Sequence, residues 1–234
     1  MTSDIHVKPA PGDQFAADLR GFGPIGIFSI LAIVFGGNLF ISNIIFVPLG
    51  GLLALIWTLR SHTPWAELGY IRPKSWMFTI VVGLVFGIGL KLLMKTIVMP
   101  LLGANAVNTT YHFLAGNKAL FPLAILFMIV AGFAEETVFR GFLFQRFSKL
   151  FGPAVWVKTL SVLVSTLLFG LGHYADQGLA GFEQATVVGF IYGLIYAATG
   201  RIWLLIIAHA AFDIAAVAII YLNLELKIAH LFFR

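Results

Sequence analysis

The chain has 234 residues, of which 60% are hydrophobic and 11% are charged. A mean hydropathy of +0.97 excludes an ordinary soluble domain and predicts an all-α membrane protein that crosses the bilayer several times. The absence of cysteine excludes disulfides, thiolate metal sites and cysteine nucleophiles. The net charge of +5 forms no basic patch, because the lysines and arginines stand singly beside apolar segments, so we expect no nucleic-acid partner.

The first half of the chain is predicted to begin with a short soluble tail over residues 1–20, which has no apolar core and therefore no signal peptide. From Phe22 to Leu59 the sequence carries no charge and is too long for one span of about 20 residues. A break between Gly36 and Asn43 predicts two helices in a tight hairpin. Residues 60–75 are polar and are expected to form an interfacial loop.

Five more spans are predicted, roughly at residues 76–94, 119–147, 157–174, 182–198 and 202–222. Residues 21–222 are then one polytopic bundle of about seven transmembrane helices, with eight as the alternative, around an intramembrane site. Residues 223–234 are expected to be a tail or a short interfacial helix. The excess of Lys and Arg falls on the side that places the N-terminus in the cytoplasm.

Two kinds of residue inside these spans are predicted to have structural roles. Gly83 with Gly87, and later Gly189 with Gly193, have the small-xxx-small spacing that permits close helix packing. Lys91 and Lys95 are expected to snorkel to the membrane interface.

Residues 131–145 set Glu135, Glu136 and Arg140 inside an apolar span. A charged group near the bilayer centre costs about 2.5–3.5 kcal/mol, so these side chains require a structural or chemical reason. Glu136 and Arg140 are four residues apart and are predicted to pair, whereas Glu135 points about 140° away from Arg140. We therefore expect Glu135 to face a cavity as a general base. The alternative is a buried ion pair that only fixes helix packing.

Two later spans each carry a histidine: His173, four residues after Phe169, and His209, four residues before Asp213. Taken singly, each is more often a satisfied core residue. At about 1.5 Å per residue, Glu135, His173 and His209 lie about 16, 22 and 12 Å from the inner ends of their spans, so they can meet within the membrane. This set of side chains is that of a water-activating hydrolytic site, a metal site or a proton pathway.

The ordered motifs Glu135-Glu136-x-x-x-Arg140, Phe169-x-x-x-His173 and His209-x-x-x-Asp213 resemble the CPBP family of intramembrane proteases. That family includes the type II CAAX prenyl endopeptidases, the abortive-infection proteins and the bacteriocin self-immunity proteins. The resemblance extends from about residue 65 to residue 213, and its motif-bearing part is about residues 119–213.

The resemblance implies an endopeptidase that acts on membrane-associated proteins or peptides, among which prenylated CAAX proteins are one class. Glu135 would activate water with help from His173, and His209 with the residue four later would stabilise the oxyanion or position the water. Asp213 stands where many members have Asn, so it either stays protonated or orients His209. The predicted catalytic residues are Glu135, Glu136, Arg140, His173, His209 and Asp213.

Metal dependence has two interpretations. Glu135, His173 and His209 could supply three zinc ligands, but a metal-free glutamate mechanism uses the same residues, and no His-Glu-x-x-His motif decides between them. We expect no cofactor, with zinc as the alternative. The small size and short tails resemble a bacterial member in the inner membrane.

Two other functions remain as alternatives to the peptidase. One is a proton-coupled transporter, although the sequence shows no convincing inverted repeat. The other is a non-catalytic scaffold or immunity protein of the same fold.

Overall fold

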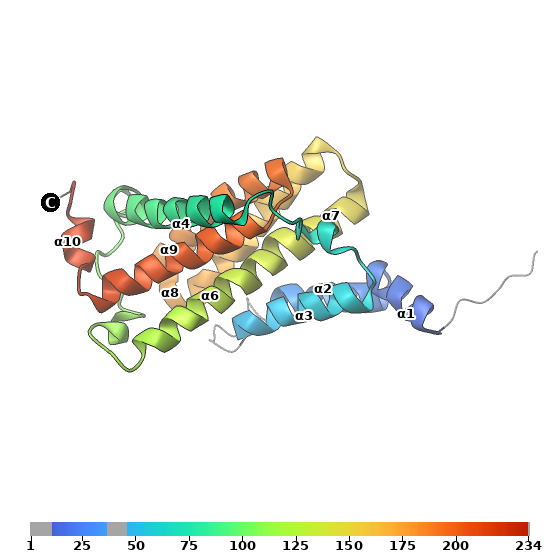
Figure 1. The fold of residues 1–234 in the computed structure, drawn as a ribbon, viewed down its shortest axis with the longest axis horizontal. Coiled ribbons are helices and arrows are strands. Elements are labelled where there is room, and N and C mark those ends of the chain that lie inside the picture. Colours follow the sequence, from blue (N-terminus) through green and yellow to red (C-terminus); the bar gives the residue numbers. More distant parts are fainter. Residues whose placement is uncertain (1–10, 37–45, 234) are drawn as a thin grey trace, which may run out of the picture.

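The computed structural model describes residues 11–36 and 46–233, and every regular element within these ranges is a helix (Figure 1). The predicted all-α class is therefore confirmed. The break predicted between Gly36 and Asn43 falls outside the described residues, apart from Gly36 itself.

Three short helices come first: α1 (Pro11–Arg20), α2 (Pro24–Phe35) and α3 (Phe46–Arg60). The expected tail is thus helical from residue 11. Its first turn carries an acidic side chain and its last turn a basic one, which is the favourable arrangement for a helix dipole. Leu19 of α1 is buried, and its carbonyl accepts a hydrogen bond of 3.1 Å from Trp57 Nε1 of α3. This bond anchors the N-terminal helices to one another.

Four helical segments are long and apolar enough to cross a membrane, or up to five if the pair α1 and α2, bent by 60°, counts as one. The described residues therefore indicate a multi-pass membrane protein, but they do not show seven crossings. The first long segment consists of α4 (Trp76–Leu93), the π-helical turn η2 (Met94–Val98) and α5 (Met99–Leu101). The second consists of α6 (Phe121–Glu136), the π-helical turn η4 (Thr137–Phe142) and α7 (Leu143–Phe151). The third and fourth are α8 (Val155–Thr199) and α9 (Trp203–Tyr221).

Three short elements complete the described structure: η1 (Trp65–Leu68), η3 (His112–Leu114) and α10 (Glu225–Ala229). Helix α9 contacts both α4 and α6, and α3 lies against α6 (Figure 1). Helix α10, in the segment expected as a tail or short helix, contacts η2.

Gly178 divides helix α8 into two antiparallel arms. The φ and ψ angles of Gly178 are 61° and −154°, a conformation that side chains disfavour. The arms lie side by side, because Lys158 Nζ near the start of the first arm donates a 3.1 Å hydrogen bond to the carbonyl of Ala197 near the end of the second. The break lies between the two spans predicted at 157–174 and 182–198.

Close helix contacts occur at both predicted glycine pairs. A Cβ atom on Gly87 of α4 would lie 2.1 Å from the carbonyl oxygen of Ala208 in α9. A Cβ atom on Gly189 would lie 3.0 Å from the Phe169 ring across the two arms of α8. The predicted packing role is confirmed, and it places α4, α8 and α9 close enough to share one core.

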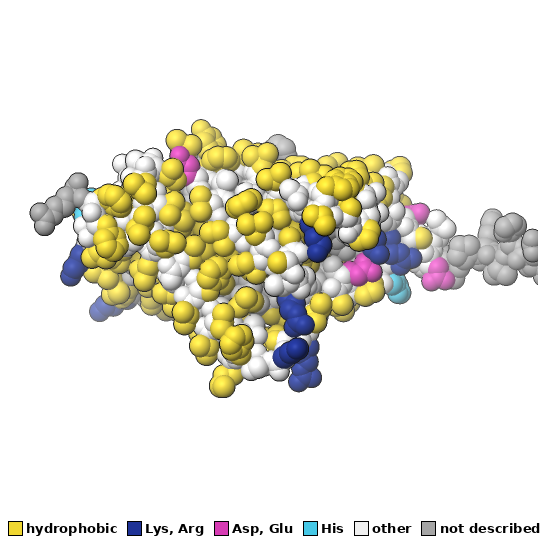
Figure 2. All heavy atoms as spheres, turned by 90° about the horizontal axis from the view of Figure 1, so that it is seen from above, with side chains coloured by type: hydrophobic (Ala, Val, Ile, Leu, Met, Phe, Trp, Pro, Cys, Tyr) yellow, Lys and Arg dark blue, Asp and Glu magenta, His cyan; other side chains and the backbone are white. Residues whose placement is uncertain are grey.

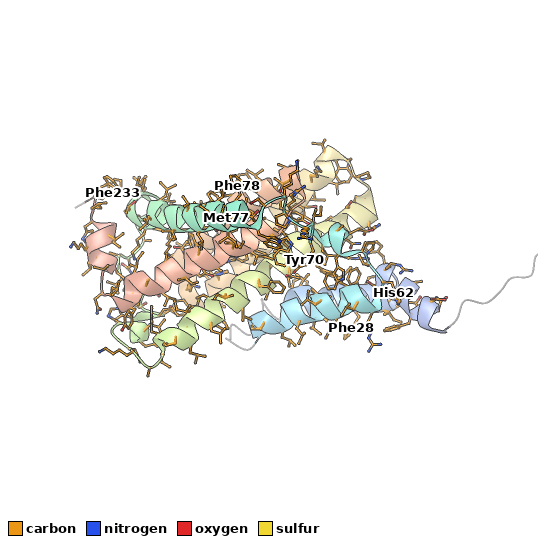
Figure 3. The ribbon with its side chains drawn as sticks, in the orientation of Figure 1. Phe28, His62, Tyr70, Met77, Phe78 and Phe233 are labelled. Atoms are coloured by element: carbon orange, nitrogen blue, oxygen red, sulfur yellow. The ribbon has the colours of Figure 1, made fainter. Side chains whose placement is uncertain are left out.

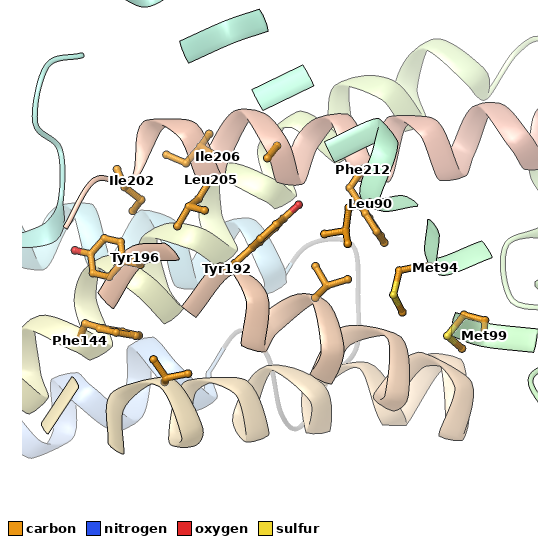
Figure 4. Packing of buried hydrophobic residues seen from close by; sticks show 13 residues of the cluster. Leu90, Met94, Met99, Phe144, Tyr192, Tyr196, Ile202, Leu205, Ile206 and Phe212 are labelled. Atoms are coloured by element: carbon orange, nitrogen blue, oxygen red, sulfur yellow. The ribbon is translucent and has the colours of Figure 1, made fainter. Parts of the chain in front are cut away.

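The outer surface and the core are both apolar. Figure 2 shows hydrophobic side chains over most of the visible face, with the charged groups gathered in a few places. Phe28, Met77 and Phe78 are 72%, 76% and 69% exposed on outer faces (Figure 3), as expected for side chains that contact lipid. The largest core cluster includes Tyr192 and Phe212 and lies between α4, α8 and α9 (Figure 4).

Candidate active site

The predicted pair of Glu136 and Arg140 is present at the junction of α6 and η4. Arg140 Nη1 donates to Glu136 Oε1 at 2.9 Å, and neither side chain is exposed. Arg140 Nη2 donates to the carbonyl of Gly189 at 3.1 Å, and the guanidinium lies 4.8 Å from the centroid of the Phe169 ring. Since Phe169 and Gly189 belong to different arms of α8, the arginine connects the glutamate segment to both arms.

The π-helical turn η4 begins directly after Glu136. Thr137 Oγ1 donates to the carbonyl of Phe133 at 2.6 Å, which leaves its oxygen to accept the hydroxyl proton of Tyr70 at 2.6 Å. Burial raises the pKa of Tyr70 to about 12, so the hydroxyl stays protonated near neutral pH. Tyr70 lies where the loop before α4 meets the bundle (Figure 3). The loop thus supports a local distortion of the kind that recurs at functional sites.

His209 of α9 is held by the second glutamate. Its Nδ1 forms a 2.8 Å hydrogen bond with Glu136 Oε1. Because the carboxylate of Glu136 is paired with an arginine and can only accept, Nδ1 carries the proton of this bond. The arrangement fixes the orientation of a ring that is 3% exposed.

The opposite nitrogen of the same ring faces two further carboxyl groups. His209 Nε2 lies 3.3 Å from Glu135 Oε2 and 3.5 Å from Asp213 Oδ2. An imidazole nitrogen between two carboxyl groups requires at least one proton among the three groups, since lone pairs would otherwise face one another. Glu135, His209 and Asp213 therefore form one unit for proton exchange.

His173 lies near the end of the first arm of α8. Its Nδ1 donates to the carbonyl of Phe169 at 2.9 Å, so Nε2 is the nitrogen left for another partner. His173 lines a cavity of about 300 Å³ together with Glu135, His209 and Asp213. The structure thus brings all the predicted site residues to one region, with Glu136 and Arg140 behind the cavity wall and His173 on the wall itself.

The loop before α6 and helix α10 also line this cavity. Glu225 of α10 accepts hydrogen bonds from the backbone N–H of Asn108 at 2.8 Å and from His112 Nδ1 at 3.2 Å. Lys95 Nζ lies 3.6 Å from Glu225 Oε1 and also donates to the carbonyl of Ala106. These contacts connect α10, the loop and η2 around one buried carboxylate.

The expectation that Lys91 and Lys95 snorkel to the interface is wrong. Lys91 is 8% exposed, lines the cavity and donates to Gln184 Oε1 at 3.0 Å. Lys95 lines the same cavity and pairs with Glu225. The reason is that the bundle offers these ammonium groups polar partners inside, so they need not reach the membrane surface.

The zinc alternative requires Glu135, His173 and His209 to converge on one point. In residues 11–36 and 46–233, no group of three or more His, Asp or Glu side chains is arranged to hold a metal ion. Within the described ranges, Nδ1 of His209 is engaged by Glu136 and Nδ1 of His173 by a backbone carbonyl. These contacts leave Nε2 of each ring as the nitrogen that could coordinate a metal, so they do not decide between the two interpretations, and the expected independence from metal stays a prediction.

Sequence reasoning missed several contacts of the site. The pairing of Glu136 with Arg140 was predicted, but its hydrogen bond to His209 was not. His209 is 73 positions away, and no sequence spacing indicates that the two residues meet. The expectation that Lys91 snorkels to the membrane interface also missed its place in the cavity, although a lysine inside an apolar span is itself a sign of a functional site. Gln184, a polar residue in the second arm of α8, carries the same kind of signal.

Comparison with known proteins gives a family match. Residues 117–215 match the family model described as Type II CAAX prenyl endopeptidase Rce1-like. The match covers somewhat less than half of the chain and includes all six predicted catalytic residues. No curated protein and no solved structure gives a significant match.

Proposed function

Given that residues 117–215 form an Rce1-like domain of the type II CAAX prenyl endopeptidase (CPBP) family, we propose that this protein is an intramembrane endopeptidase in which Glu135 activates water. The observation that carries the proposal is the 3.3 Å approach of Glu135 Oε2 to His209 Nε2 at the wall of a cavity. The histidine is held from behind by Glu136, and Glu136 by Arg140.

In the first step, the water oxygen bonds to the carbonyl carbon of the scissile peptide and Glu135 takes one proton of that water. The carbonyl oxygen becomes an oxyanion, which accepts a hydrogen bond from the N–H at Nε2 of His209. Glu136 fixes the donor by holding Nδ1, so the ring need not reorganise as charge develops. Nε2 of His173 accepts the second proton of the water as a hydrogen bond and so orients the nucleophile.

In the second step, the carbon–nitrogen bond breaks and the leaving amine takes the proton that Glu135 has held. The second product is a carboxylic acid, which loses its proton to solvent. Asp213 lies 3.5 Å from His209 Nε2, and we assign it the role of orienting this nitrogen between catalytic cycles. An asparagine at position 213 could donate a hydrogen bond to the oxyanion, whereas an ionised aspartate can only accept one. Orienting His209 is therefore a role that suits Asp213.

The proposed substrates are peptide segments of membrane-associated proteins, since the site lies among helices apolar enough to span a bilayer. We place the protein in a bacterial inner membrane with a cytoplasmic N-terminus, which the excess of Lys and Arg on that side supports.

A direct test incubates the purified full chain, in lipid nanodiscs, with a peptide library whose cysteine-containing members are supplied with and without a farnesyl group. Mass spectrometry of the products should reveal internal cleavage that is absent with Glu135→Gln. Equal cleavage by the two proteins would overturn the proposal. A preference for one half of the library would identify whether the substrate is prenylated.

A further inference from the structure

Lys91 lines the cavity and, among the described residues, has no carboxylate within ion-pair distance. Its side chain is 8% exposed, its Nζ donates to Gln184 Oε1 at 3.0 Å, and it lies 4.8 Å from the centroid of the Phe212 ring. Within the described ranges no carboxylate forms an ion pair with it, whereas Lys95, one turn later, pairs with Glu225 at 3.6 Å. Lys91 of α4 and Lys95 of η2 therefore differ in what neutralises them.

The partners of Lys91 do not satisfy an ammonium group. Three N–H donors are available, and one neutral amide oxygen and one aromatic face engage only part of them. Burial and the neighbouring Lys95 disfavour the charge on Lys91, whereas Asp213 and Glu225 favour it from beyond ion-pair distance. Burying a cation with so little compensation is costly unless an anion joins it.

Gln184 completes a recognition site for such an anion. Because its Oε1 accepts from Lys91, its amide NH2 group remains a donor on the same side of the cavity. Both residues line the cavity that contains Glu135. An ammonium group and an amide NH2 group together suit a singly charged, planar group with two oxygen atoms.

We propose that Lys91 and Gln184 form a subsite that binds a carboxylate of the peptide substrate. This inference rests on the proposed peptidase function and adds to it a preference for anionic peptides. A carboxylate suits the site better than a phosphate, because the second lysine is already neutralised by Glu225 and because Glu135 and Asp213 line the same space.

The position of the subsite predicts where along the peptide the carboxylate lies. Phe212, over which Lys91 lies, directly precedes Asp213 and is three residues after His209 on α9. The carboxylate is therefore bound within a few residues of the scissile bond. Its source is either the C-terminus of a short peptide tail or an acidic side chain near the cleavage point.

The test measures binding separately from turnover. Fluorescein-labelled heptapeptide libraries of uncharged residues are prepared with a free C-terminal carboxylate, with a C-terminal amide, and with the amide plus one glutamate among the last three positions. Each is titrated against full-length Glu135→Gln, which is not expected to consume the peptides, and fluorescence anisotropy is recorded. We expect at least one carboxylate library to bind about tenfold or more tightly than the plain amide library, and which one it is identifies the source.

Two variants in the Glu135→Gln background complete the test. The affinity ratio is that of the preferred carboxylate library to the plain amide library. Lys91→Met, which preserves side-chain length and removes the charge, should reduce this ratio to near one, and Lys91→Arg should keep most of it. Lys118→Met removes an exposed lysine outside the cavity and should leave the ratio unchanged. A ratio that survives Lys91→Met, equal binding of all libraries, or no binding at all would overturn the subsite. Turnover by the wild-type chain tests the peptidase function independently of these ratios.

Discussion

His209 Nδ1 lies 2.8 Å from Glu136 Oε1, so the second glutamate of the pair holds the histidine whose other nitrogen faces the first. Glu136 accepts from Arg140 through the same oxygen atom at 2.9 Å. Adjacent residues on one helix therefore have different tasks: Glu136 orients a partner from behind, and Glu135 lines the cavity. Single substitutions at and around these residues separate the two tasks.

Replacing Glu135 by Gln should abolish proteolysis while leaving the protein folded. The amide keeps the shape of the side chain but cannot accept a proton from water, and a general base contributes about 10²–10⁴-fold to the rate. Single-turnover cleavage measured by mass spectrometry, with a melting curve in the same detergent, tests both parts. Turnover within tenfold of wild type would exclude Glu135 as the base.

Replacing Arg140 by Leu should lower both stability and activity. It leaves Glu136 charged in a site where neither side chain is exposed, and breaking a buried pair costs about 3–5 kcal/mol. Reversible unfolding of the purified protein in mixed micelles measures the loss.

The matched control for Arg140 is Lys149→Leu. Lys149 pairs with Glu67 at 3.2 Å, but its side chain is 53% exposed, and such surface pairs contribute about 1 kcal/mol or less. Equal losses of unfolding free energy in the two variants would show that the buried pair stabilises the protein no more than the surface pair does.

Replacing Tyr70 by Phe should lower kcat although the protein stays folded and loses little stability. The change removes the hydroxyl that donates to Thr137 at the start of the π-helical turn η4. The loss of one neutral hydrogen bond lowers the free energy of unfolding by about 0.5–1.5 kcal/mol. If the bond positions the glutamates, kcat should fall while KM stays near its wild-type value. Thr137→Val should give the same kinetic pattern. A change in KM alone would contradict a positioning role.

Chelation addresses the metal question. We predict that a strong chelator leaves activity intact and that elemental analysis of protein purified without added metal finds well under one zinc per chain. His209→Asn should retain partial activity, because an amide can donate to the oxyanion. Stoichiometric zinc that is lost together with activity, and restored with it, would instead make Glu135, His173 and His209 metal ligands.

The sequence alone determined the class of the protein and named the candidate site residues that the structure brings to one region. Its hydropathy permits only a membrane protein, since few charges interrupt the apolar segments. The placement of Glu135, Glu136 and Arg140 in such a segment requires a structural or chemical role, because buried charge is costly. The pairing of Glu136 with Arg140 follows from helical geometry, which is local and therefore readable at a spacing of four.

The tertiary structure decided which groups meet across helices. Nothing in the spacing connects Glu136 with His209 or Lys91 with Gln184, because these contacts depend on how α4, α6, α8 and α9 pack. The same packing turned Lys91 from a predicted interfacial residue into a cavity residue. Local periodicity specifies the face of a helix on which a side chain lies, but the neighbour opposite that face is set by long-range contacts, and those give the site its chemistry.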